Sequence, residues 1–76
     1  MDKDLFSIYW EDPQGNTHTE CVFQPLDTLG DTWKRLTSGP AAKLGIVRRA
    51  ILVDALDCIA LEYTYERRMQ YLNNGN

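Results

Sequence analysis

The sequence predicts an α+β domain in which an N-terminal antiparallel β-hairpin packs on two or three α-helices, the C-terminal one long. Three observations lead to this fold class. Two runs rich in aromatic and β-branched residues flank a turn-forming segment near the N-terminus, an apolar stripe with helical spacing follows, and a long apolar segment without proline fills the C-terminal half. A chain of 76 residues is expected to form a single domain over residues 1–76.

The hairpin is expected over about residues 5–24. The segment Asp12-Pro13-Gln14-Gly15-Asn16 consists of residues that favour turns, and it separates two strand-like runs. Alternation along the strands predicts a polar face that carries Tyr9, Glu11, His18 and Glu20. The predicted apolar face comprises Phe6, Ile8, Trp10, Cys21 and Phe23.

A short helix is expected over about residues 28–37. Leu29, Trp33 and Leu36 recur at the spacing of one helix face, and Asp27 or Thr28 can cap the start. The sequence Ser38-Gly39-Pro40 should end this helix, because proline suits the first turn of a new helix and not the interior of an old one.

A helical segment is expected over about residues 41–72, either continuous or broken near Gly45. As one helix it would be roughly 48 Å long, too long for a compact chain of this size. It would also be apolar on two opposite faces, so we expect the second face to meet another chain, most simply in a homodimer. The alternative is that broken pieces bury both faces within one chain. The last residues, 73–76, are expected to fray. The second face comprises Ile46, Ala50, Val53, Leu56 and Ala60.

The distribution of charge is informative about the partners of the chain. Residues 1–31 hold seven acidic side chains and one basic one, whereas residues 32–76 hold four acidic and seven basic ones. The acidic half is one candidate contact surface and suits a basic partner. The basic segment 34–49, with five basic side chains and no acidic one, is the other. The longest mostly apolar run, residues 46–61, contains four charged side chains and is unsuited to a membrane span. Without a recognisable signal peptide, the chain is expected to be cytoplasmic.

No catalytic residue, cofactor or metal site is predicted. His18 is the sole histidine and lacks a neighbouring nucleophile in the predicted hairpin. Cys21 and Cys58 are too few for a zinc site and are expected to be free thiols, with a single disulfide as the alternative. Asp54 and Asp57 would share a helix face but supply too few ligands for a cation.

Residues 41–51 resemble the helix-turn-helix segment of phage Cro and repressor proteins. The resemblance rests on Ala41, on Gly45 at the turn, and on Ile51 six residues further on. It implies DNA binding by a recognition helix that begins near the two arginines. The basic residues that would then contact nucleic acid are Lys34, Arg35, Lys43, Arg48 and Arg49.

These observations favour a small non-enzymatic protein-binding module. We expect a phage-type inhibitor that occludes a surface on a host protein concerned with defence or with nucleic acid. A helix-turn-helix regulator is the alternative. Tyrosine favours interface hot spots, and Tyr9, Tyr63 and Tyr71 are the candidate contact tyrosines. The predicted interface comprises Tyr9, Glu11, Glu20, Ile46, Val53, Leu56 and Ala60.

Overall fold

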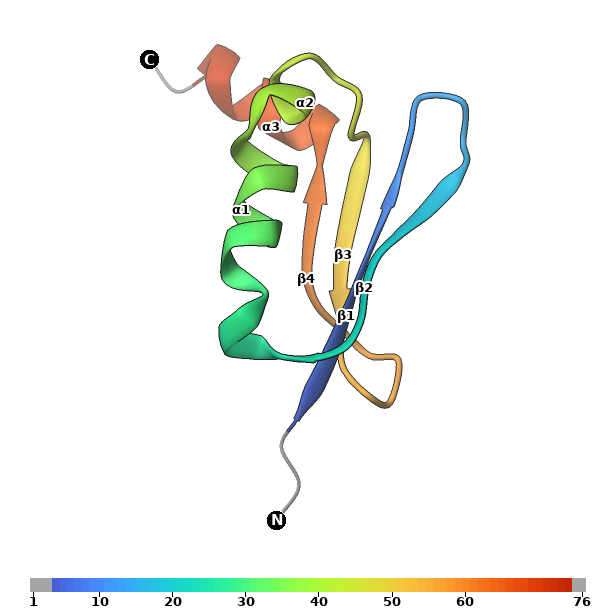
Figure 1. Cartoon of the computed structure of the whole chain (residues 1–76). Coiled ribbons are helices and arrows are strands. Elements are labelled where there is room, and N and C mark those ends of the chain that lie inside the picture. Colours follow the sequence, from blue (N-terminus) through green and yellow to red (C-terminus); the bar gives the residue numbers. More distant parts are fainter. Residues whose placement is uncertain (1–3, 75–76) are drawn as a thin grey trace.

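The computed structural model describes residues 4–74 and shows an α+β fold (Figure 1). A four-stranded antiparallel sheet is the central element, and short helices lie beside it. The elements in chain order are β1 (Leu5–Glu11), β2 (Thr17–Pro25), the 3-10 turn η1 (Leu26–Thr28), α1 (Gly30–Ser38), α2 (Pro40–Lys43), β3 (Arg49–Val53), β4 (Ile59–Thr64) and α3 (Tyr65–Asn74).

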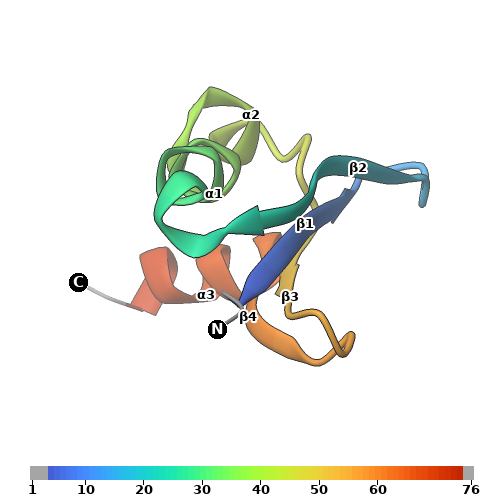
Figure 2. The ribbon, with the colours of Figure 1, turned by 60° about the horizontal axis from the view of Figure 1, so that its bottom comes forward.

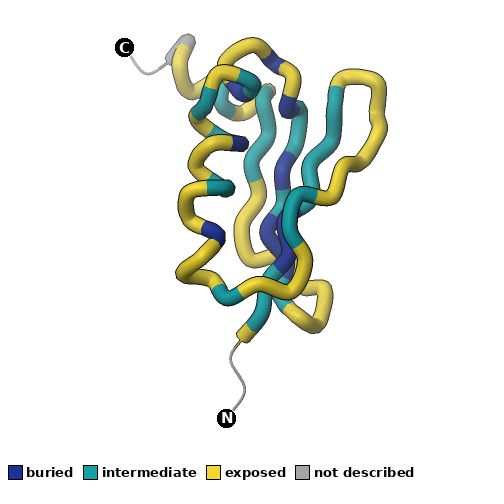
Figure 3. Tube along the Cα trace, viewed as in Figure 1, coloured by how far each residue is buried: buried dark blue, intermediate teal, exposed yellow. Residues whose placement is uncertain are grey.

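The strands are ordered β2-β1-β3-β4, which leaves β2 and β4 at the two edges. The helices lie on one face of the sheet, and the opposite face is uncovered within the described chain (Figure 2). The core forms between the sheet and α1, where Ile8, Leu29 and Leu36 are at most 3% exposed. Figure 3 shows the buried positions along β1, β3 and the inner side of α1.

The N-terminal hairpin matches the prediction in position but not fully in register. Ile8 faces Cys21 as expected, whereas Trp10 faces His18 and not Thr19. Two irregularities in the β1–β2 pairing cause the difference. A bulge adds one residue to a strand and reverses which face the following side chains occupy. Phe23 consequently lies outside the predicted apolar face, with a positive φ of 50° and 60% exposure.

The first predicted helix is confirmed, as is its end. η1 and α1 lie on either side of Leu29 over the expected region, and α1 ends at Ser38. The predicted cap is wrong: Leu29 precedes α1 without a side-chain cap, and the Thr28 hydroxyl donates to the carbonyl of Pro25. Gly39 has extended backbone angles between the two helices, and Pro40 occupies the first turn of α2. A Cβ atom on Gly39 would collide with the backbone carbonyl oxygen of Arg35, so glycine is required for this sharp bend.

The prediction of a long helix over residues 41–72 is wrong. α2 ends after one turn, and Gly45 follows with φ 79°, a left-handed conformation that suits glycine. Residues 49–53 and 59–64 then form the β3–β4 hairpin, and helix returns only at Tyr65. Asn73 and Asn74 belong to α3, while the rest of the tail predicted to fray, residues 75–76, lies outside the described residues.

Hydrogen bonds to the side chain of Asp54 stabilise the turn between β3 and β4. Its Oδ1 atom accepts hydrogen bonds from the backbone N–H groups of Leu56 and Cys58, each at 2.9 Å. The backbone N–H of Asp54 donates to the carbonyl of Cys58, and that of Asp57 donates to the carbonyl of Asp54. Asp57 has φ 65°, in the left-handed region that few residues other than glycine adopt.

The β1–β2 loop is built in the same way. Oδ1 of Asp12 accepts hydrogen bonds from the N–H groups of Gln14 and Asn16, each at 2.9 Å. The third residue after this aspartate again has a positive φ, but here it is Gly15, at 88°. The two hairpins therefore share one loop design, and the second places Asp57 where the first has glycine.

Substitutions in the second loop test this design. We expect Asp57→Gly to stabilise the fold by about 0.5–1 kcal/mol, because glycine adopts a left-handed conformation without steric cost. Asp54→Ala should destabilise it by about 1–2 kcal/mol, because two loop N–H groups lose their acceptor. Urea unfolding measures both, with Asp31→Ala as a control at an exposed aspartate outside the loops. A loss of stability in Asp57→Gly would contradict the assignment.

Candidate functional site

The predicted contact residues of the hairpin separate into two environments. Tyr9 and Glu11 lie half-buried on the uncovered face of the sheet, where they line a shallow hollow with Ile51. Glu20 lies towards α1. Its carboxylate accepts hydrogen bonds from Trp10 Nε1 at 3.2 Å and from Arg35 Nη2 at 2.6 Å. Glu20 therefore ties the hairpin to α1 and is engaged within the chain.

The five apolar residues of the second helix face, which was predicted to meet another chain, do not share a surface. Ala50 has no exposed surface in β3. Val53 is buried, with 5% exposure, at the end of β3. Leu56 is 84% exposed in the β3–β4 loop, and Ile46 is 44% exposed in the segment before β3. Ala60 is exposed in β4. The predicted stripe required one continuous helix, and the hairpin scatters its members.

The helix-turn-helix geometry implied by residues 41–51 is not formed. Residues 46–48 have no regular structure, and Arg49 begins β3, so the segment provides no recognition helix. Three of the five predicted nucleic-acid contacts are engaged within the chain. Arg35 pairs with Glu20, Arg49 with Glu62 at 2.7 Å, and Arg48 stacks over the ring of Tyr65. Lys34 and Lys43 are exposed on α1 and α2.

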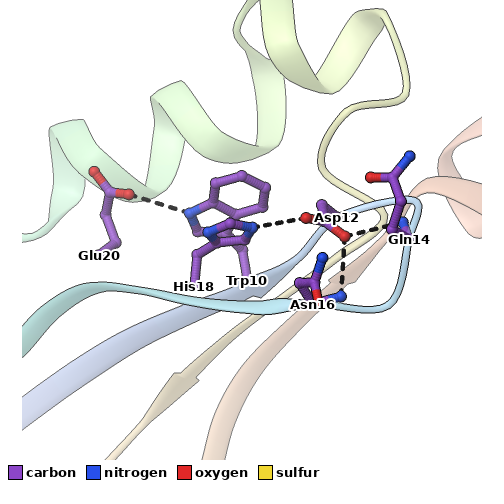
Figure 4. Close-up of polar contacts among 6 residues, drawn as sticks. All are labelled: Trp10, Asp12, Gln14, Asn16, His18 and Glu20. Atoms are coloured by element: carbon purple, nitrogen blue, oxygen red, sulfur yellow. Dashed lines mark hydrogen bonds and ion pairs between the residues drawn. The ribbon is translucent and has the colours of Figure 1, made fainter.

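His18 belongs to a polar cluster that joins the two strands of the first hairpin (Figure 4). Its ring stacks on that of Trp10 with the centroids 4.2 Å apart, and its Nε2 atom lies 2.8 Å from Oδ2 of Asp12. The prediction that His18 shares the polar face of the hairpin with Glu11 is therefore wrong, because His18 lies on the same face as Trp10. The contact with His18 and the loop N–H groups hold the pKa of Asp12 below its ordinary value. His18 therefore has a structural role: its contacts with Asp12 and Trp10 stabilise the β1–β2 loop.

The described residues provide no group of histidine, cysteine and carboxylate side chains able to hold a metal ion. Both thiols are free, with Cys21 half-buried and Cys58 exposed. None of the helices within residues 4–74 combines the length and apolar character needed to cross a membrane.

A groove runs along the edge strand β4, with α1 and α3 as its walls. Its volume is about 480 Å³. Trp33 of α1, Leu61 and Tyr63 of β4 and Tyr71 of α3 are the large apolar and aromatic side chains of its lining. The remaining lining residues are Thr37, Ser38, Glu62, Thr64, Arg67 and Arg68.

The basic character of the groove comes from the first turns of α3. The backbone N–H of Arg67 donates to Oγ1 of Thr64 at 3.3 Å, which caps the helix and places Arg67 and Arg68 on the groove wall. Within residues 4–74, neither arginine is in a salt bridge, whereas the groove's acidic residue, Glu62, is paired with Arg49. The groove therefore presents uncompensated positive charge.

The hydroxyl group of Tyr63 makes no hydrogen bond within the described chain. Its hydroxyl oxygen is shielded from solvent and has no partner within the described chain. Burial raises the pKa of Tyr63, and the nearby Arg68 and Arg48 only partly oppose this effect. The hydroxyl therefore stays protonated at neutral pH and can donate a hydrogen bond. Buried polar groups without partners are uncommon in folded proteins, so this one needs an explanation.

The sequence signals for the groove were present but incomplete. Tyr63 and Tyr71 were predicted as contact residues, and the structure brings them to one groove. Arg67 and Arg68 were missed. The alternation of Ile59, Leu61 and Tyr63 with smaller or polar residues is the pattern of a strand, and it could have located β4.

The comparisons with known proteins identify no relative. No protein-family model, curated protein or solved structure matches this chain.

Proposed function

We propose that this chain is a non-enzymatic protein-binding module that adds an extended segment of a partner protein to the free edge of β4. The observation that supports the proposal is the combination of that edge with the adjoining groove. β4 pairs with β3 on one side only, and the residues from Ile59 to Glu62 are all exposed. An unpaired edge offers main-chain hydrogen bonds, and a neighbouring groove gives selectivity for side chains.

The apolar content of this edge favours a binding role over a protected edge. Ile59 and Leu61 are 52% and 49% exposed, and Leu72 of α3 is 51% exposed. Natural proteins usually protect an edge strand with lysine, proline or a covering element. The other edge, β2, is interrupted by two irregularities and ends at Pro25. β4 has a single irregularity, at Ala60, and contains neither lysine nor proline.

Binding at this edge fits the inhibitor role expected from the sequence. A small chain that occupies an extended segment of a host defence or nucleic-acid-handling protein would block that segment for other partners. Such action needs no catalytic group. The exposed aromatic and apolar side chains beside β4, which include Tyr71 at 74% exposure, are of the kind that dominates interface energetics.

A proline in β4 tests the proposal. Leu52 pairs with Leu61 and Val53 with Ile59, so Ala60 is an extra residue at a bulge, where an edge strand tolerates proline. We expect peptides selected from a random display library against the chain to shift the amide resonances of residues 59–64. Ala60→Pro should weaken their binding about tenfold or more by blocking the edge, while Ala60→Gly should retain it.

Three results would contradict the proposal. One is a library that yields no binder, and another is a set of binders that shift only the uncovered sheet face around Tyr9 and Ile51. The third concerns the predicted homodimer. If light scattering shows a dimer and Ala60→Pro converts it to a monomer, then a second copy of this chain binds the β4 edge.

A further inference from the structure

We propose that the segment bound at β4 carries an acidic side chain, which the groove receives between Arg67 and Arg68. This inference rests on the proposed function and specifies the chemistry of the partner. It combines two observations: the groove is lined by two arginines without a salt-bridge partner among residues 4–74, and it lies along the unpaired edge of β4.

The charges around the groove favour an acidic ligand. Arg67 and Arg68 line it without a salt-bridge partner among residues 4–74. Glu62, the single carboxylate in the lining, is 2.7 Å from Arg49 and is neutralised by that contact. A carboxylate entering the groove would therefore meet two free guanidinium groups. Arginine suits this task because its planar fork can hold both oxygens of a carboxylate.

The arginines are the groups that would recognise the acidic side chain. The hydroxyl of Tyr63 is shielded from solvent and is therefore not exposed to a ligand in the groove. A carboxylate accepts hydrogen bonds from the two guanidinium groups, whereas a lysine or arginine side chain of the partner would offer only further donors.

The surroundings favour a peptide carboxylate over a nucleic-acid phosphate. The groove lies along an unpaired strand edge, where a peptide backbone can pair and a nucleic-acid backbone cannot. The chain also has a net charge of −3, which opposes the long-range attraction on which phosphate binding depends. The groove is thus local positive charge on an acidic protein, an arrangement suited to one or two carboxylates.

The test uses the peptide selected most strongly from the random library, with its affinity measured by fluorescence anisotropy. We expect aspartate or glutamate at a fixed position among the selected peptides. Changing that residue to its amide should weaken binding to the unmodified chain about tenfold to a hundredfold. In a chain carrying both Arg67→Gln and Arg68→Gln, the same change in the peptide should have little effect. The difference between the two chains measures the interaction between the peptide carboxylate and the two arginines.

Two further variants separate the hydroxyl and general electrostatics. Tyr63→Phe removes only the solvent-shielded hydroxyl, should fold at least as well, and should bind the acidic peptide within about twofold of the unmodified chain. Lys34→Gln removes one positive charge from α1 outside the groove lining and should leave the affinity within about twofold. Circular dichroism confirms that each variant is folded.

The outcomes distinguish this inference from the proposed function. Selected peptides that bind at β4 without a fixed acidic residue, or whose amide forms bind equally well, would overturn the inference and leave strand addition standing. A library without binders would overturn both. A labelled poly-dT oligonucleotide that binds the groove in place of peptide would overturn both by identifying a phosphate ligand.

Discussion

Ile8→Ala is expected to destabilise the chain by about 2–5 kcal/mol, because it deletes a fully buried side chain at the centre of the sheet. Ile8 has no exposed surface and faces Cys21 on one side and Leu52 on the other. A domain of this length has a total stability of roughly 4–11 kcal/mol, so the variant should be partly or wholly unfolded at room temperature. Urea unfolding followed by tryptophan fluorescence measures the loss.

Ile59→Ala is the matched control for this substitution. It removes the same atoms from the same sheet, but Ile59 is 52% exposed on the edge strand. Its loss should be below about 1 kcal/mol, because most of the side chain remains in water in the folded state. Equal losses at the two positions would contradict the placement of the core between β1, β3 and α1.

The N-terminal half of the fold could be predicted because its turns use conspicuous residues. Pro13 and Gly15 mark the first loop, and Gly39 with Pro40 marks the bend between α1 and α2. Proline and glycine constrain or release backbone angles directly, so their effect is local and legible in sequence. The register was harder, because bulges in β2 arise from pairing with β1 and have no local signal of comparable strength.

The C-terminal half was mispredicted because its decisive turn lacks glycine. The loop from Asp54 to Cys58 repeats the first loop, but Asp57 takes the left-handed position that glycine holds there. Apolar residues on both sides of a continuous run are common to a buried strand and a buried helix, and periodicity alone does not separate them. The β-branched residues Ile51, Val53 and Ile59 were the local evidence for strands.

The groove could be anticipated only in part. Tyr63 and Tyr71 have the residue type of interface anchors, and they were identified as such. Their meeting with Trp33 depends on α1 and α3 lying on the same face of the sheet, which is a property of the tertiary arrangement. The free charge of Arg67 and Arg68 likewise depends on Glu62 being paired elsewhere, with Arg49 of the neighbouring strand.

Val53→Asp and Leu56→Asp, made separately, should have opposite outcomes and so decide between hairpin and helix for residues 49–64. Val53 is 5% exposed and faces Ser7, itself buried, in the β1–β3 pairing. A carboxylate placed there would be buried without a partner, at a cost of about 3–5 kcal/mol. We expect circular dichroism to show a largely unfolded chain.

Leu56→Asp should leave the fold intact, because Leu56 is 84% exposed in the β3–β4 loop and contributes little to the core. On one continuous helix the two positions would lie on the same face, three residues apart, and the two substitutions would act alike. Equal tolerance of both, or equal unfolding, would therefore contradict the hairpin. The separation arises because Asp54 turns the chain immediately after Val53, so that Val53 enters the interior and Leu56, three residues later, is left in solvent.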